Sequence, residues 1–352
     1  MIMSIDKKCQ GCGVKLQTSD ITKLGYVLDM NHDLCKDCFN LKHYHKVKDG
    51  IDTASMPIIE ENALVVYVLS VNHISERLKY RLDRHFYGSE FILVINHIDT
   101  LEQSVNLNRM IHKLREETNR LQMKWLDIVP VSAKTGKYVN ELIETLAYFQ
   151  RNRNIYLVGY QNSGKSTLFQ KIAQTNNIDV SVLAGKKPGL TQDLFDIPFG
   201  TKKLFDTPGI YLEGSIAEYY PFEIYKDLIV EQKIKPTIFQ LNESQSVIIG
   251  AQAIFSFLKG GFKGISFHFN KSVSLHRTKY ENAYELFDKH KGSLFKPYNE
   301  THTYVKQTFK LNQDTKYEIT ISDIGVIHIK GDAIIEMYYL KGLRLTLTES
   351  LY

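Results

Sequence analysis

Residues 159–166 read GYQNSGKS, and this short stretch decides the fold class of the chain around it. An apolar run at 154–159 precedes it and a helical pattern at 165–173 follows it, which is the strand–loop–helix setting of a phosphate-binding loop. In such a loop the glycines let backbone N–H groups curl around a β-phosphate, and the start of the helix adds positive potential. We expect Lys165 to reach the β- and γ-phosphates and the Ser166 hydroxyl to ligate magnesium. The nucleotide contacts predicted in this loop are Gly159, Asn162, Ser163, Gly164, Lys165, Ser166 and Thr167.

The motifs that read a guanine base come before the phosphate loop rather than after it. Residues 96–99 read NHID at the end of the apolar run 91–96, and residues 131–134 read VSAK at the end of the next run. The Asp99 carboxylate can accept both N–H donors on the guanine edge, which adenine cannot satisfy, and the Ala133 N–H can bond the guanine carbonyl oxygen. The base-reading residues predicted here are Asn96, His97, Asp99, Ser132, Ala133 and Lys134.

The order of these motifs predicts a circularly permuted GTPase domain over residues 51–215. In an ordinary GTPase the phosphate loop lies near the start and the base-reading motifs close the domain, whereas here the base-reading half comes first. The chain alternates strand and helix patterns, which indicates an α/β fold with a doubly wound, mostly parallel sheet. The predicted strands are 64–71, 91–96, 127–132, 154–159 and 203–205, and the predicted helices are 75–86, 105–121, 139–149 and 165–173.

Residues 206–209 read DTPG and lie downstream of the phosphate loop. Asp206 can hold the magnesium shell through water, and the Gly209 N–H can face the γ-phosphate. Between the two loops Thr191 offers a hydroxyl to magnesium and the γ-phosphate, provided that its loop closes over the nucleotide. Thr201 is an alternative for that role. The predicted magnesium ligands are therefore Ser166, Thr191 and Asp206.

All four cysteines fall in two Cys-x-x-Cys pairs near the start of the chain, Cys9 with Cys12 and Cys35 with Cys38. Two such pairs supply the four sulfur ligands of a tetrahedral zinc ion and leave no open position for water. The alternative is a pair of redox dithiols, but the surrounding sequence does not resemble a thioredoxin βαβ unit. We therefore expect residues 1–50 to form a small structural zinc module.

The composition is that of a globular protein that leans basic, with a net charge of +5 and a pI of about 8.7. This balance suits local contacts with RNA, and it is equally ordinary for solubility. The N-terminus lacks the apolar core of a signal peptide, and no run approaches the roughly 20 apolar residues that span a bilayer, so a cytoplasmic location without membrane contact is expected.

The last part of the chain, residues 216–352, carries no nucleotide motif and is expected to be an α+β domain that contacts RNA or the ribosome. A helix is expected at 216–230, and short β-type runs fill 237–263 and 304–352. Residues 271–291 are unevenly basic. Contact with RNA and a solvated helix face explain that segment equally well.

With these motifs in place, the chain resembles the YqeH family of circularly permuted GTPases over essentially its whole length. The resemblance includes the cysteine module, the permuted motifs, LHRTK at 275–279 and DIGVI at 323–327. It implies a slow GTPase that assists assembly of the small ribosomal subunit, binds GTP or GDP with magnesium, and touches ribosomal RNA or protein. It also implies that Asn162 coordinates a potassium ion that stimulates turnover. The predicted catalytic residues are Lys165, Asn162, Thr191 and Gly209.

Four positions depart from the usual GTPase pattern. His97 stands where the family has a lysine whose stem packs along the purine, and Tyr67 and Ser70 replace acidic residues near the end of the first strand. Ile210 cannot orient the attacking water as glutamine does in many GTPases. Two functions are therefore considered: a GTP-hydrolysing assembly switch, and a nucleotide-sensing RNA-binding scaffold with little or no turnover. A zinc-dependent DNA-binding regulator is disfavoured, because one zinc module does not explain the nucleotide motifs, and no DNA partner is expected.

Overall fold

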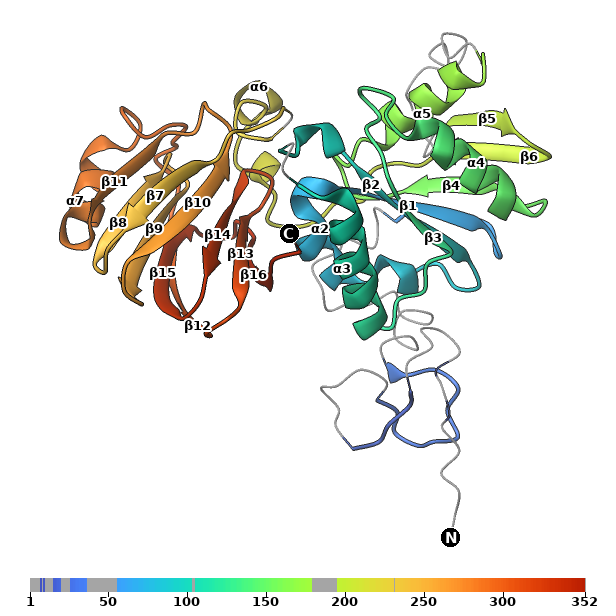
Figure 1. The fold of residues 1–352 in the computed structure, drawn as a ribbon, viewed down its shortest axis with the longest axis horizontal. Helices are drawn as coiled ribbons and strands as arrows, with labels where there is room; N and C mark the ends of the chain where they lie inside the picture. Colours follow the sequence, from blue (N-terminus) through green and yellow to red (C-terminus); the bar gives the residue numbers. More distant parts are fainter. Residues whose placement is uncertain are drawn as a thin grey trace. The chain divides into compact units, whose positions relative to one another are not determined.

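The structure is a computed structural model that describes residues 7, 9, 15–19, 26–36, 56–102, 105–178, 195–230 and 232–351. The chain divides into two compact units, one of residues 1–99 with 105–213 and one of residues 100–104 with 214–352 (Figure 1). Each unit has its own apolar core. Within the described ranges, no helix has the length and apolar character needed to cross a membrane.

The first unit is built on a six-stranded sheet with the order β3-β2-β1-β4-β6-β5. Its neighbouring strands are parallel except for the antiparallel pair of β5 and β6. The prediction of a doubly wound, mostly parallel sheet is confirmed. The strands are β1 Leu64–Ser70, β2 Glu90–Asn96, β3 Asp127–Pro130, β4 Ile155–Val158, β5 Phe195–Phe199 and β6 Lys202–Asp206.

The strand order places the phosphate-loop strand in the middle of the sheet. The chain lays β1, β2 and β3 side by side, then returns so that β4 pairs with the free side of β1, and continues outward to β6. The sheet is therefore wound in two directions from the β1–β4 pair, which is the topological switch point where such folds bind ligands. Because parallel strands end at the same edge, the loops after β2, β3, β4 and β6 meet there despite their separation in the sequence.

Helices cover both faces of this sheet. On one face, α4 Val139–Gln150 and α5 Lys165–Thr175 pack their buried leucines and Phe169 against alternate residues of the strands. On the other face lie α3 Leu107–Arg120 and the short α2 Ile74–Arg77, which contact β3 and β1 respectively. Figure 1 shows α4 and α5 next to each other, apart from α2 and α3.

The prediction of one helix over 75–86 is wrong. The segment breaks into α2 and two 3₁₀ turns, Leu78–Tyr80 and Leu82–Arg84, with Arg81 between them at φ 46°. The Arg81 guanidinium donates to both carboxylate oxygens of Asp83, at 2.9 and 2.7 Å, and to the Leu121 carbonyl at 2.7 Å. These charge-assisted bonds offset the cost of a left-handed backbone at a residue with a side chain.

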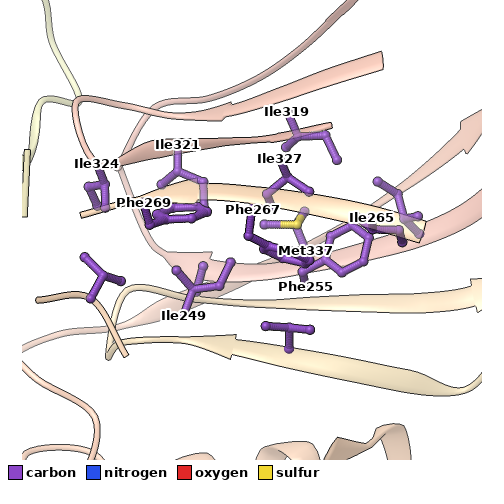
Figure 2. Close-up of a cluster of buried hydrophobic side chains, with 14 of the residues drawn as sticks. Ile249, Phe255, Ile265, Phe267, Phe269, Ile319, Ile321, Ile324, Ile327 and Met337 are labelled. Carbon is purple, nitrogen blue, oxygen red and sulfur yellow. The ribbon is translucent and has the colours of Figure 1, made fainter. Parts of the chain in front are cut away.

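The second unit contains two five-stranded antiparallel sheets that enclose one core. The first sheet has the order β16-β13-β14-β10-β7 and the second β11-β8-β9-β15-β12. Figure 2 shows side chains of both sheets meeting in this core, among them Phe267 and Ile319 from the first sheet and Phe255 and Met337 from the second. The strands are β7 Thr237–Leu241, β8 Gln245–Ile249, β9 Ala253–Lys259, β10 Lys263–Phe269, β11 Leu275–Lys279, β12 Tyr304–Leu311, β13 Lys316–Ile321, β14 Gly325–Lys330, β15 Ala333–Leu340 and β16 Leu345–Glu349.

One helix, α7 Tyr280–His290, packs Ala283 and Phe287 against the outer face of the second sheet. The unit is therefore α+β in class but rich in strands. The helix expected at 216–230 is wrong, because only a 3₁₀ turn, Ile216–Glu218, and the short α6 Phe222–Tyr225 form there. Pro221 lies between them in extended backbone, where it cannot supply the N–H that a continuous helix requires.

The basic segment 271–291 divides between two elements. Its basic side chains His276, Arg277 and Lys279 lie on the edge strand β11, whereas the exposed face of α7 mixes acidic and basic residues. A solvated face is thus the simpler explanation for the helical half. The strand half remains a candidate contact for RNA.

Candidate nucleotide site

A single amide side chain joins three loops at the carboxyl edge of the first sheet. Asn96 ends β2 and is completely buried. Its Nδ2 donates to the Ser163 carbonyl of the phosphate loop at 3.0 Å, and its Oδ1 accepts from the Ala133 N–H at 3.0 Å. The structure therefore places the base-reading motifs next to the phosphate loop, although they are far apart in the sequence. The two hydrogen bonds of the Asn96 side chain connect them.

The Asp99 carboxylate is held in place by the neighbouring loop. Ser132 is buried, and its hydroxyl donates to Asp99 Oδ1 at 2.7 Å while accepting from the Thr135 N–H at 3.1 Å. Asp99 itself is partly exposed, as a group that must meet a base would be. The Ala133 N–H, which we expected to meet the guanine carbonyl oxygen, donates to Asn96 instead, so a bound guanine would have to share that donor. Lys134 is exposed at the end of the same loop.

His97 follows Asn96 with a left-handed backbone, at φ 64°. Its Nδ1 lies 2.9 Å from the Ser70 hydroxyl at the end of β1, so two of the residues that depart from the family pattern are in contact. Burial lowers the pKa of the imidazole, with the nearby Asp99 charge opposing the shift. The ring is therefore neutral at pH 7.

The glycines of the phosphate loop are required by close backbone approaches. A Cβ on Gly159 would run into the Val68 carbonyl oxygen of β1. Gly164 caps α5 at φ 80°, and a Cβ there would collide with the Asn96 amide and lie 2.7 Å from His97 Nε2. The Ser163 hydroxyl is buried and finds no hydrogen-bond partner within the described ranges. A cradle of backbone with an unsatisfied donor fits a phosphate group.

Lys165 is buried at the start of α5, and its Nζ donates to the carbonyls of Gly159 and Tyr160 at 3.0 and 3.2 Å. Burial lowers the pKa of Lys165 to about 8, although the Asp206 charge opposes the shift. A phosphate would give this ammonium the anionic partner that two neutral carbonyls do not supply.

Ser166 and Asp206 form a pair of oxygen donors beside Lys165. Burial raises the pKa of Asp206, while a hydrogen bond from Ser166 and the Lys165 charge oppose that shift. Asp206 Oδ1 is buried and accepts no hydrogen bond from any residue that the structure describes. A hydroxyl and a carboxylate oxygen are ligands that magnesium prefers, so these residues fit the predicted metal.

The segment after Asp206 is bonded back onto the phosphate loop. The Ile210 N–H donates to the Gly159 carbonyl at 3.0 Å, and the Gln161 N–H donates to the Ile210 carbonyl at 3.1 Å. Gly209 lies against Gln161, since a Cβ there would be 2.9 Å from its Cγ. The Ile210 side chain is fully buried, so it contributes packing at this position.

The remaining predicted site residues are Asn162, Thr167 and Thr191, with Thr201 as the alternative to Thr191. Asn162 is exposed at φ 59°, and its side chain makes no hydrogen bond in the part of the chain that the structure describes; Thr167 is exposed on the first turn of α5. Thr191 lies outside the described residues. Thr201 lies in the turn between β5 and β6, at the sheet edge opposite Asp206, so it cannot replace Thr191.

The structure describes half of the predicted zinc site. Cys9 and Cys35, one from each pair, are both buried, and the Cys35 N–H donates to Cys9 Sγ at 3.2 Å. Leu16 and Val27 pack around them. Cys12 and Cys38 lie outside the described residues, and no group of three or more potential metal ligands occurs in the ranges that the structure covers. The zinc site therefore stays a prediction.

Comparison with known proteins places this geometry in a family. A family model described as "YqeH-like, C-terminal" matches residues 263–351, and one described as "50S ribosome-binding GTPase" matches residues 154–260. YqeH of Bacillus subtilis (strain 168) is 31% identical over 361 residues, covering 97% of this chain and 98% of that protein. The chain belongs to the YqeH family. The resemblance inferred from the motifs is confirmed.

Two longer proteins are more distant relatives of this YqeH-family chain. NO-associated protein 1, chloroplastic/mitochondrial, of Arabidopsis thaliana is 23% identical over 344 residues, covering 82% of this chain and 61% of that protein. Nitric oxide-associated protein 1 of Homo sapiens is 23% identical over 222 residues, covering 48% of this chain and 32% of that protein. The GTPase match begins at residue 154, so the Asn96–Asp99 motif lies upstream of it, as the permuted order requires.

The depressed pKa of Lys165 predicts a pH-dependent nucleotide affinity. A phosphate partner would raise this pKa, so binding above pH 8 must take up a proton, and affinity should fall as pH rises. We expect GDP affinity, measured by titration with a fluorescent analogue, to be flat below pH 7. It should then weaken by up to about tenfold per pH unit above pH 8.

Lys165→Arg is the matched control, because arginine stays charged throughout this range. Any slope that persists in this variant belongs to the nucleotide itself. Equal slopes in the parent and the variant would contradict the assignment.

Proposed function

We propose that this protein is a GTP-hydrolysing switch that assists assembly of the small ribosomal subunit. The observation that supports it best is the Asn96 amide, which joins a guanine-reading loop to a phosphate loop in the permuted order of the family. The name of the matched GTPase family and the relationship to YqeH support a ribosomal role. The assignment to the small subunit is our own.

The proposed roles follow the geometry of the site. Asp99, oriented by Ser132, selects guanine, together with Asn96, His97, Ala133 and Lys134. Lys165 exchanges its two carbonyl partners for phosphate oxygens, and Ser166 with Asp206 holds magnesium. Bound magnesium would neutralise charge that develops on the phosphates. Thr191 and Gly209 would order on the γ-phosphate and release after hydrolysis.

The proposed organisation has three parts: a zinc module at 1–50, the GTPase domain at 51–215 and a C-terminal domain at 216–352. The permutation places Gly209 only a few residues before Gly214, where the main segment of the second unit begins. A change at Gly209 therefore has a short covalent route to the C-terminal domain. We propose that this domain contacts ribosomal RNA or protein in the cytoplasm.

The competing function is a nucleotide-sensing scaffold that binds RNA and hardly hydrolyses GTP. It is motivated by His97 in the base motif and by the buried Ile210, which has no polar side-chain atom for the attacking water. The two functions differ in turnover. Multiple-turnover phosphate release in the presence of ribosomal subunits separates them, since a scaffold would release little or no phosphate.

Nucleotide-dependent binding to subunits tests the ribosomal role. We expect co-sedimentation with purified small subunits in a non-hydrolysable GTP analogue, and release in GDP. Lys165→Ala should abolish the difference, whereas Lys124→Ala, at an exposed lysine outside the site, should preserve it. Co-sedimentation with large subunits instead would contradict the subunit assignment. Failure to bind either subunit in any nucleotide state would contradict assembly itself.

Potassium-dependent turnover is expected from Asn162. Its exposed amide oxygen is available to a monovalent cation, which would offset charge developing between the β- and γ-phosphates. Phosphate release should be faster in potassium than in sodium, and Asn162→Ala should remove that difference while sparing GDP affinity. Asn177→Ala is the control, because Asn177 is also exposed and left-handed, at φ 56°, but follows α5. Equal rates in both salts would exclude the potassium role.

One zinc ion per chain is expected on Cys9, Cys12, Cys35 and Cys38. The two cysteines that the structure describes are buried together, as ligands of one closed site would be. Cys35→Ser should lower the zinc content and unfold the N-terminal module while GTP binding stays measurable. Metal analysis of protein purified without chelators measures the stoichiometry, and an absence of zinc there would refute the prediction.

A further inference from the structure

Ser70 contacts His97 of the base-reading motif, and the proposed function gives Ser70 no role. Ser70 ends β1 and His97 follows β2, so the register of two neighbouring strands, with Ser70 opposite Asn96, brings them together. Their separation of 2.9 Å between Oγ and Nδ1 is that of a good hydrogen bond.

The tautomer of His97 decides which atom of this pair donates, and the second contact of Ser70 favours one direction. Its Oγ already accepts from the Asn72 N–H at 3.4 Å, as the cap of the 3₁₀ turn Val71–His73. The Ser70 O–H still has a hydrogen to donate, and His97 Nδ1 is the acceptor that lies 2.9 Å away; we take this direction as part of the proposal below. An imidazole that accepts at Nδ1 carries its single proton on Nε2 when it is neutral. Burial lowers the pKa of His97 and so keeps the ring neutral.

The other ring nitrogen faces the phosphate loop. His97 Nε2 lies 2.7 Å from the position that a Cβ on Gly164 would occupy. Gly164 is the last residue before α5, where the loop bends at φ 80°. His97 Nε2 thus lies where the loop after β2 meets the phosphate loop. The first of these loops would hold the base of a nucleotide and the second its phosphates.

We propose that Ser70 is a positioning residue that fixes His97 as a neutral Nε2–H donor to an oxygen of the nucleotide's sugar–phosphate. This proposal rests on the proposed guanine-nucleotide site. An uncharged imidazole held by Ser70 then takes the place of a flexible, charged lysine. Its consequence is a nucleotide bound more weakly and released faster than by a lysine at this position.

Two amide substitutions at His97 separate the roles of the ring nitrogens. Glutamine places its amide nitrogen near the position of Nε2, whereas asparagine places its amide near Nδ1. His97→Gln should keep GDP affinity within about twofold of the parent, while His97→Asn should weaken it about two- to tenfold. His97→Lys should tighten binding and slow GDP release.

Ser70→Ala completes a double-mutant cycle. It should weaken GDP binding by about two- to tenfold in the parent and leave it unchanged in the His97→Gln background. Equal losses in both backgrounds would mean that Ser70 acts on the fold and not through His97, and the proposal would be wrong. His112→Asn, at an exposed histidine of α3, is the matched control and should change nothing.

A spectroscopic readout of the nucleotide-free protein tests the tautomer without any ligand. In protein labelled with ¹⁵N-histidine, the resonances that His97→Gln removes should report the Nε2–H tautomer, and Ser70→Ala should mix the tautomers. An Nδ1–H tautomer in the parent would overturn the proposal. If the parent bound no guanine nucleotide, the proposed function and the nucleotide contact would both fall. If the parent binds GDP normally and the Ser70 and His97 variants bind it equally well, the proposed function stands and only the role of Ser70 and His97 is wrong.

Discussion

The arrangement of the nucleotide site depends on the two hydrogen bonds of the Asn96 side chain. One fixes the backbone of the phosphate loop and the other fixes the loop after β3, and both are buried. Because an unpaired buried amide costs free energy, the three loops are most stable when they form together. Asn96 thereby sets the spacing between the cradle for phosphate and the carboxylate for the base.

The permutation is compatible with this site because strand ends, rather than chain order, decide which loops meet. β1 pairs with β4 from Leu64↔Ile155 to Tyr67↔Val158, and this parallel register places the phosphate loop beside the end of β1. The same register gives Gly159 its close approach to the Val68 carbonyl, while the register of β1 with β2 brings Ser70 to His97. The permutation changes which part of the chain follows the site, because the segment after the Gly209 loop leads directly into the second unit.

Much of the sheet and of the phosphate loop could be predicted from the sequence, because apolar strands and the GxxxxGKS pattern are local signals. The helix at 75–86 could not, since its interruption depends on Arg81 bonding to the distant Leu121 carbonyl. The error at 216–230 was avoidable, because Pro221 is visible in the sequence. The contact of Ser70 with His97 and the engagement of Ala133 with Asn96 follow from strand register, which spacing along the chain does not reveal. The roles of Thr191, Cys12 and Cys38 stay predictions.

The central claim is that the base-reading half, placed ahead of the phosphate loop, selects guanine through Asp99. The most direct measurement is the affinity of the parent and of Asp99→Asn for GDP and for xanthosine diphosphate. The Ser132 hydroxyl can still donate to an amide oxygen at this position, so the loop should keep its shape. The account predicts that the parent prefers GDP and that the variant loses GDP affinity and gains affinity for the xanthine nucleotide. A variant that binds GDP as tightly as the parent would contradict it.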